Sequence, residues 1–360
     1  MLSMKTSLAS SRRGFLKTSF LGGVALGSGG LFAPARSLAQ AVATPAASAP
    51  TRVALTTGTD RAAMAFEGLK PFSAELQRRI GTRRVVIKPN NVAIDTPLCA
   101  THADTLRGIL EFLKSIGKLE HAVIAESAAA GPTLEGFDNY RYTALAGAYG
   151  VKLVDLDQDE LELIHVFDEK DFRPHPMRTC RTLLDPDSFV ISATRFKTHD
   201  RVVTTLSLKN IVVGAPIKDA GFRWGRTSKP GAKNDKPIVH GNGFRGLNWN
   251  LYALAPRLHP HLAVLDGVEG MQGNGPVGGT PVDHRVCVVS PDWLAADRVA
   301  VELMGIPFEK VGYLNFCAQA KLGQADLAKL EIIGPALQEH IKPYRLHDNV
   351  EQQLIWMKPA

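Results

Sequence analysis

Cysteine is scarce in this sequence, and the few cysteines are widely spaced. The 360 residues contain four, with no CxxC pair among them: Cys99, Cys180, Cys287 and Cys317. A ferredoxin-type cluster or an all-cysteine zinc site needs closely spaced thiolates, so we expect no cysteine-ligated iron–sulfur cluster. Buried thiols are the simplest interpretation, and spacing alone does not show whether any two form a disulfide.

Familiar catalytic motifs are also missing. The sequence has no HExxH zinc motif and no GxSxG nucleophile elbow. Ser127 has no base partner that the sequence identifies, which argues against a serine hydrolase. The chemistry must therefore be inferred from the placement of polar residues rather than from a known signature.

Acidic residues are absent before Asp60, and this region resembles a twin-arginine export signal. Residues 11–17 read SRRGFLK, a glycine-rich apolar stretch follows over 18–33, and a small-x-small cleavage site ends at Ala39. The stretch is short for a permanent membrane span. We expect residues 1–39 to be a Tat signal peptide that meets the Tat translocase and signal peptidase. The mature chain would then be periplasmic or otherwise extracytoplasmic.

The signal changes the meaning of the net charge. The whole chain carries +7, but residues 1–39 hold five of its 42 basic residues and no Asp or Glu. Their removal leaves 37 basic and 35 acidic residues, a net charge of +2. A nearly neutral mature chain gives no reason to expect nucleic-acid binding.

The remaining chain has the pattern of an α/β protein. Residues 40–51 form an Ala/Pro/Ser linker, 52–335 an α/β domain, and 336–360 a C-terminal extension. Short apolar strands alternate with helical patterns, which predicts a mostly parallel sheet with helices on both faces; two lobes around a cleft are an alternative. The expected strands are 52–58, 84–88, 121–125, 151–156, 189–193, 261–265, 286–290 and 330–334.

Polar groups follow several of these strands. Lys88 and Asn90 end one strand, Glu126 and Ser127 follow the next, Lys197 and His199 follow 189–193, and Asp266 follows 261–265. In open α/β sheets ligands bind outside the carboxyl ends of the strands, so these groups predict one site at that edge. The basic, Gly/Pro-rich stretch 214–243 lacks a clear period, and a loop of that length is usually functional or disordered.

A glycine-rich segment, DGVEGMQGNGPVGG, occupies residues 266–279. It is not a Walker A loop. Its glycines permit backbone conformations in which N–H groups face an anion, so Gly273, Asn274 and Gly275 are candidate substrate-binding residues. A flexible turn between two strands is the alternative interpretation.

Several motifs occur together in one order: VVIKPN at 85–90, AES at 125–127, FKTH at 196–199, LSLKN at 206–210, and the later DG…GNGP…G. Over about residues 52–335 this combination resembles the DUF362 family, a domain of unknown function. Some relatives carry a ferredoxin-like cluster segment, for which this chain lacks the cysteines. The resemblance supports the site residues and supplies no established reaction.

The candidate residues suggest anion binding and proton transfer. Lys88, Lys197 and Lys209 are predicted to hold a carboxylate or phosphate, together with Asn90, Ser127 and Asn210. His199 is a candidate general base, acid or metal ligand, and Lys197 a second catalytic candidate.

Two classes of function remain open. One is an enzyme acting on a small anionic substrate, with a divalent metal or other cofactor as an additional expectation. The other is a non-catalytic periplasmic protein that binds a ligand, metal or cofactor. Glu126 and Asp266 are the candidate ligands for a divalent metal. The oligomeric state stays open.

Overall fold

The computed structural model of this chain describes residues 50–224 and 228–358. The predicted signal peptide, residues 1–39, and the linker up to residue 49 lie outside the described residues. Thr51, expected at the end of the linker, is the first residue of the first strand. The described residues all belong to one compact unit rather than to the two lobes considered above.

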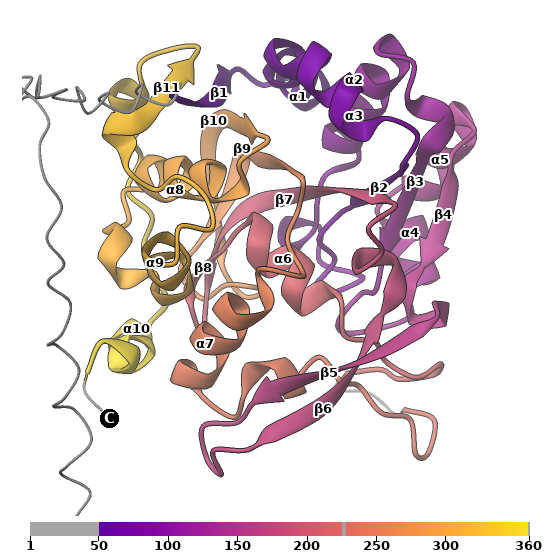
Figure 1. Cartoon of the computed structure of the whole chain (residues 1–360), viewed down its shortest axis with the longest axis vertical. Coiled ribbons are helices and arrows are strands. Elements are labelled where there is room, and N and C mark those ends of the chain that lie inside the picture. The colour runs from indigo at the N-terminus through magenta and orange to yellow at the C-terminus, as the bar shows by residue number, and fades with distance from the viewer. Residues whose placement is uncertain (1–49, 225–227, 359–360) are drawn as a thin grey trace, which may run out of the picture. The chain divides into compact units, whose positions relative to one another are not determined.

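A mostly parallel sheet of nine strands runs through this unit (Figure 1). Its order is β11-β1-β10-β9-β7-β2-β3-β4, with β8 paired to β7. The pairings of β10 with β1 and β9, and of β8 with β7, are antiparallel, and the others are parallel. The strands are β1 Thr51–Thr57, β2 Arg84–Lys88, β3 Ala122–Glu126, β4 Lys152–Asp155, β7 Ser188–His199, β8 Val203–Thr205, β9 Leu262–Gln272, β10 Thr280–Ser290 and β11 Leu330–Ile333.

Helices cover both faces of the sheet, as the sequence predicts. Alternate residues of β2 enter two different hydrophobic cores: Val85 and Ile87 pack with one set of helices, and Val86 packs with the other. The first set is α1 Arg61–Leu69, α2 Ser73–Ile80, α3 Ala103–Ser115, α4 Thr133–Asn139 and α5 Tyr142–Tyr149. The second set is α6 Ser207–Gly214, α7 Phe244–Leu254, α8 Trp293–Leu303 and α9 Gly312–Gln319.

Some elements differ from the sequence expectation. The pattern over 60–79 forms two helices, because Pro71 lies in a 3-10 turn between α1 and α2. The pattern over 133–149 also divides, at Arg141, whose φ is 63°. The irregular section before β7 contains a separate two-stranded sheet, β5 Leu161–Phe167 and β6 Pro174–Cys180.

The C-terminal extension packs against the α/β domain. It ends in the short helix α10, Val350–Gln353, followed by a 3-10 turn. The buried carboxamide of Gln353 donates to the carbonyl of His199 at 2.9 Å and accepts the N–H of Val203 at 2.6 Å. The extension therefore fixes the β7–β8 connection from outside the sheet.

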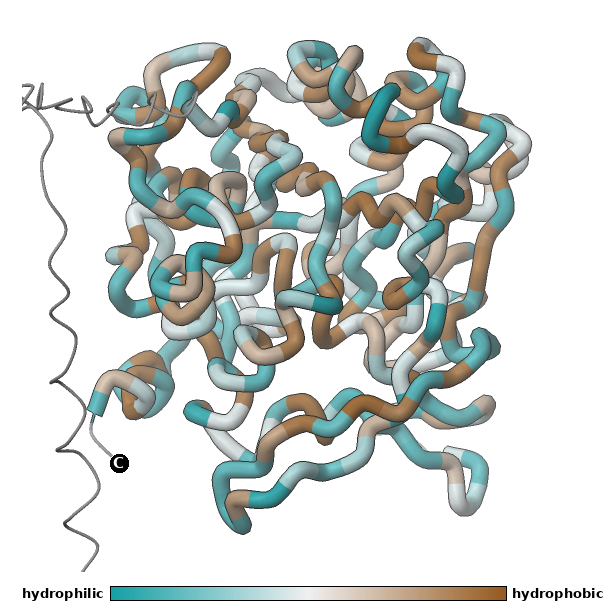
Figure 2. Tube along the Cα trace, in the orientation of Figure 1, coloured by the Kyte–Doolittle hydropathy of each residue, from teal (hydrophilic) through white to brown (hydrophobic). Residues whose placement is uncertain are grey.

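Hydrophobic and hydrophilic residues alternate closely along the chain (Figure 2). Among the described residues, no helix has the combined length and apolar character that crossing a membrane requires. The apolar residues instead contribute to the two cores on the faces of the sheet.

Candidate anion-binding site

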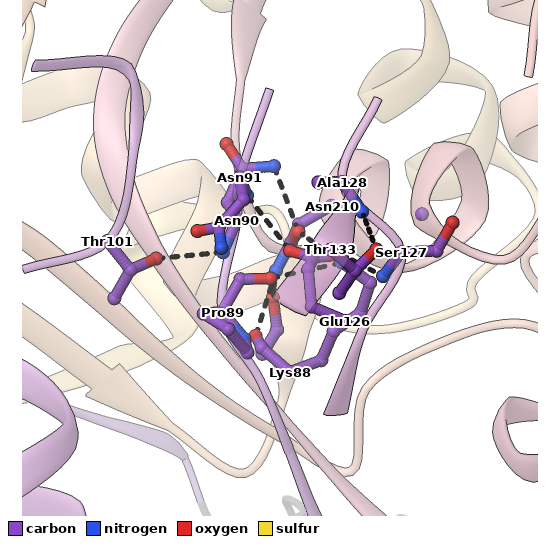
Figure 3. Close-up of polar contacts among 12 residues, drawn as sticks. Lys88, Pro89, Asn90, Asn91, Thr101, Glu126, Ser127, Ala128, Thr133 and Asn210 are labelled. Carbon is purple, nitrogen blue, oxygen red and sulfur yellow. Dashed lines mark hydrogen bonds and ion pairs between the residues drawn. The ribbon is translucent and has the colours of Figure 1, made fainter. Parts of the chain in front are cut away.

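An ion pair joins the carboxyl ends of β2 and β3. Nζ of Lys88 lies 2.5 Å from Oε1 of Glu126, and both side chains are 1% exposed (Figure 3). Glu126 also accepts the backbone N–H groups of Asn91 at 2.9 Å and Ser127 at 2.8 Å. Because the carboxylate meets three donors, its burial is compensated, and the pair holds the two strand ends together.

Two asparagines extend this network toward α6. Oδ1 of Asn210 accepts from Nζ of Lys88 at 3.1 Å and from Nδ2 of Asn90 at 3.0 Å. Nδ2 of Asn210 donates to the carbonyl of Lys88 and to Oγ of Ser192. Asn210 thus uses both ends of its carboxamide within the protein, which fits a residue that positions its neighbours.

Lys197 is joined to this network through Asn90 but is not part of the cavity lining. Its ammonium donates to Oδ1 of Asn90 and, at 2.6 Å, to the carbonyl of Cys99. Burial lowers the pKa of Lys197 to about 7, because the surroundings penalise the charged form. From this position Lys197 orients Asn90, and it does not line the cavity described below.

The connection from β7 to α6 determines where Lys209 lies. β7 continues to His199, the chain returns through β8, and α6 begins at Ser207. The buried carboxylate of Asp297 accepts the N–H groups of Ser207 at 2.9 Å and Leu208 at 3.2 Å. These bonds cap the first turn of the helix, and Lys209 is its third residue.

Lys209 is a buried cation without a partner. It is 6% exposed and lines a cavity, yet none of the described residues forms a hydrogen bond or ion pair with its ammonium. Burial lowers its pKa to about 8, with Asp200 opposing the shift. Unpaired charges are rarely buried, so this group needs an explanation outside the folded chain.

His199 faces the same cavity in a defined tautomer. Its Nδ1 accepts the N–H of Arg201 at 3.0 Å, so the neutral ring carries its hydrogen on Nε2. Burial, helped by nearby Lys209 and His240, holds the pKa of His199 well below its usual range. The ring is therefore neutral near pH 7 and offers an Nε2–H donor. Asp200 Oδ1 lies 3.2 Å from Nδ1.

The cavity has a volume of about 270 Å³ and collects most of the predicted residues. Its lining includes seven of them: Lys88, Asn90, Glu126, Ser127, His199, Lys209 and Asn210. The hydroxyl of Ser127 is already engaged, since it donates to Asp157 at 2.5 Å.

Sequence reasoning missed three ionisable residues of the lining: Asp200, which follows His199, and the pair Lys236 and His240. Lys236 donates to the carbonyls of Gly214 at 3.1 Å and Pro216 at 2.5 Å, and burial lowers its pKa to about 8. Burial lowers the pKa of His240 to about 3. Both belong to the 214–243 stretch, whose unusual length and basic composition were the only signals of a role.

Two further polar groups of the lining lack partners. Nδ2 of Asn91 and Oγ1 of Thr205 are buried and form no hydrogen bond with the described residues. Among the described residues, the ammonium of Lys209 and Nε2 of His199 also have no hydrogen-bond partner, and both residues line the cavity.

The glycine-rich segment was expected to bind substrate through Gly273, Asn274 and Gly275, but these residues contact other parts of the chain instead. The N–H of Gly273 donates to Arg345, and the carboxamide of Asn274 bonds to Asp348, so both residues are tied to the C-terminal extension. Gly275 packs against the carbonyl of Thr198. These three predicted residues do not line the cavity, whereas the following Pro276 and Val277 do.

The topology separates the two candidate metal ligands. Asp266 lies in β9, three strand positions from β3 and Glu126, a distance of roughly 14 Å between strand axes. Asp266 bonds instead to Arg61 at 3.2 Å and to Thr105 at 2.8 Å. Its separation from Glu126 is too large for one cation, whose ligands lie about 2–2.6 Å from the metal.

Other arrangements for metals are limited within the described part of the chain. The group of His and carboxylate atoms that come within 4.8 Å of one another is Asp168, Asp171 and His175, near the β5–β6 turn and apart from the cavity lining. All four cysteines are buried and free. The cavity itself is richer in donors than in metal ligands, which favours an anion.

Comparison with known proteins places the chain in a family. The model of a domain of unknown function, DUF362, matches residues 85–302. The chain belongs to the DUF362 family. The matched region contains Lys88, Glu126, His199 and Lys209, and therefore most of the cavity lining.

The relatives found are distant. A thylakoid-associated protein of Synechocystis sp. is 23% identical over 242 residues, which cover 67% of this chain and 68% of that protein. A crystal structure of a Thermotoga maritima protein shares 12% identity with a TM-score of 0.39. That match covers 69% of this chain and spans 60% of the solved chain, and so weak a likeness says nothing about the site.

Proposed function

We propose that this DUF362 protein is an enzyme that binds a small anionic substrate in the cavity at the carboxyl ends of β2, β3 and β7. The observation that carries the proposal is Lys209, a residue only 6% exposed that lines the cavity and whose ammonium forms no hydrogen bond or ion pair with the described residues. Burying a charge without an ion-pair partner destabilises a protein by several kcal/mol, in order of magnitude, unless something compensates it, and Asp200 offsets only part of this effect, because burial still lowers the pKa of Lys209 to about 8. A bound anion supplies that compensation.

A second donor supports the same proposal. Nε2 of His199, whose ring lines the cavity and has no other hydrogen-bond partner at this nitrogen among the described residues, is available to an oxygen of an anion. Lys88 does not serve as the counter-ion, because Glu126 already neutralises it. The cavity therefore divides the predicted lysines into one that binds the ligand, Lys209, and two that hold the structure, Lys88 and Lys197.

His199 gives the site a route to proton transfer. The Nε2–H of the neutral imidazole donates a hydrogen bond to a substrate oxygen as negative charge develops there, and transfer of that proton requires the imidazolium, since a neutral ring would be left as imidazolate. An anion beside Lys209 also weakens the positive field that lowers the pKa of His199. We assign His199 the role of proton donor, with Nδ1 held by the N–H of Arg201.

Binding is tested by calorimetric titration of the full chain with sodium acetate and with inorganic phosphate. We expect at least one of these anions to bind, and the Lys209→Met variant to lose at least tenfold in affinity, about 1.4 kcal/mol. The control is Lys329→Met, which removes an exposed lysine. Equal affinity in wild type and Lys209→Met, or no binding of either anion, would contradict the proposal.

Catalysis is tested separately with His199→Gln, because glutamine keeps a donor amide but cannot transfer a proton. Wild type and variant are incubated with an extract of small carboxylic and phosphorylated metabolites, and mass spectrometry records which compounds are consumed. An enzyme should consume a compound that the variant binds but leaves unchanged. Binding without consumption by the wild type would indicate a non-catalytic binding protein.

We further propose that residues 1–39 direct export through the Tat pathway, on the basis of SRRGFLK at 11–17 and the cleavage site ending at Ala39. A fusion of residues 1–51 to a reporter that folds before export should reach the periplasm. Replacement of Arg12 and Arg13 by lysine should keep it in the cytoplasm. Equal export of both fusions would contradict this proposal.

A further inference from the structure

A large part of the cavity lining is apolar. Six residues from five different parts of the chain contribute to it: Val92, Ala130, Val213, Trp224, Pro276 and Val277. An inorganic anion alone would leave these side chains without a contact. The site therefore has room and surface for a non-polar part of a ligand as well as for its charge.

Trp224 is the most distinctive of these residues. Its side chain is 60% exposed, although its backbone is fixed by a 2.9 Å hydrogen bond from its N–H to the carbonyl of Ala130. Val277, also in the lining, is 40% exposed. Two apolar side chains that meet both solvent and the cavity gain free energy when a non-polar ligand covers them.

The charges of the lining set the charge of the ligand. Three lysines (Lys88, Lys209 and Lys236) and two carboxylates (Glu126 and Asp200) contribute a formal charge of +1. The two lining histidines, His199 and His240, are neutral near pH 7, since burial holds the pKa of each below its usual range. A monoanion balances this site, whereas a dianionic phosphate leaves an uncompensated negative charge.

We propose that the ligand of this cavity is an organic monocarboxylate with a compact apolar or aromatic body. Its carboxylate pairs with Lys209 and accepts from Nε2 of His199, and its body contacts Trp224, Val277 and Ala130. The volume of about 270 Å³ limits the body to about the size of one ring. This inference rests on the proposed anion site and adds the chemical class of the ligand.

Calorimetry of the full chain with benzoate, acetate and inorganic phosphate tests the inference. We expect benzoate to bind at least tenfold more tightly than acetate, and phosphate to bind more weakly than benzoate. The neutral analogue benzyl alcohol should bind at least tenfold more weakly than benzoate, because it lacks the charge that Lys209 compensates.

Three variants locate the apolar contacts. Ala130→Leu fills the space beside Trp224 and should remove the preference for benzoate over acetate. Trp224→Ala should reduce benzoate affinity several-fold. The matched control is Trp249→Ala, which removes a half-exposed tryptophan that packs on Tyr252 and Phe316 outside the cavity; benzoate affinity should not change.

The outcomes separate the two proposals. If acetate or phosphate binds in a Lys209-dependent manner but benzoate binds no more tightly, the monocarboxylate inference is wrong and the anion site stands. If Lys209→Met leaves the affinity for every anion unchanged, both are wrong. If benzoate binds tightly but Ala130→Leu and Trp224→Ala have no effect, the apolar contacts assigned here are wrong.

Discussion

Lys88 and Glu126 form a buried ion pair of 2.5 Å, whereas Lys209, in the lining of the same cavity, forms no ion pair with the described residues, although the charge of Asp200 raises its pKa against the effect of burial. The contrast assigns the two lysines different roles. The first closes the gap between two strand ends and is neutralised there. In the function proposed here, the second lysine pairs with the ligand.

Removal of the Lys88 ammonium should be strongly destabilising. Lys88→Met leaves Glu126 buried with an unpaired charge, and we expect the free energy of unfolding to fall by about 3–5 kcal/mol. Urea unfolding measures the change. The matched control is Lys152→Met, on the exposed edge strand β4, which should change stability by less than about 0.5 kcal/mol. A loss below 1 kcal/mol in Lys88→Met, on the order of an exposed pair, would show that the pair is not buried.

Substitution by methionine of two other lysines of the lining should change the free energy of unfolding in opposite directions. Lys209→Met removes an unpaired buried charge and should raise the free energy of unfolding by roughly 1–3 kcal/mol. Lys236→Met leaves the buried carbonyls of Gly214 and Pro216 without their donor and should lower it by roughly 1–3 kcal/mol. Thermal and urea unfolding of the ligand-free proteins measure both. Destabilisation by Lys209→Met would argue that its ammonium has a structural partner.

Anion affinity should fall above pH 8. The free protein holds the pKa of Lys209 at about 8, and an anion binds the protonated form and raises that pKa. Affinity is therefore constant just below pH 8 and decreases by up to about tenfold per pH unit above it, until the pKa of the complex is reached. Calorimetry with acetate between pH 7 and pH 9.5 tests this. The decrease should be absent from the residual binding of Lys209→Met.

The stability of the ligand-free protein should change with pH in the opposite direction. The pKa of Lys197 is about 7 in the folded chain, against its ordinary value of 10.5. Between these values the unfolded chain binds more protons than the folded chain, so the free energy of unfolding rises with pH. Urea unfolding at pH 7 and pH 9 should show the rise, and Lys197→Met should reduce it. A fall in stability over this window that Lys197→Met leaves unchanged would contradict the assignment.

The C-terminal extension should support the site. Gln353→Ala removes both bonds that hold His199 and Val203, and we expect a loss of about 1–3 kcal/mol together with weaker anion binding. The neighbouring Gln352 is exposed, so Gln352→Ala is a matched control with little expected effect. Equal free energies of unfolding and equal anion affinities in the two variants would show that the extension does not fix the β7–β8 connection.

The sequence predicted the sheet and the strand ends well, because both follow from local patterns. Lys88, Glu126 and His199 come directly after or within apolar strands, and parallel strands place their carboxyl ends at one edge. Their order along the chain did not show that β9 is three positions from β3, which separates Asp266 from Glu126.

The rest of the site depends on contacts between distant segments. Lys236 and His240 reach the cavity because Arg178 holds the 214–243 stretch through Asp219 at 2.6 Å and Asp235 at 2.8 Å. The sequence of residues 214–243 has no periodic pattern from which this position of the loop could be predicted. In the same way, Gln353 meets His199 across 154 residues of sequence. Long-range polar contacts of this kind leave no local signal.

The most direct test of the central claim is an anomalous difference map from crystals of the full chain soaked in sodium bromide. The account predicts a bromide peak inside the cavity, beside Nζ of Lys209 and Nε2 of His199, and no such peak in crystals of Lys209→Met. Peaks confined to exposed lysines and arginines, with none in the cavity, would contradict it.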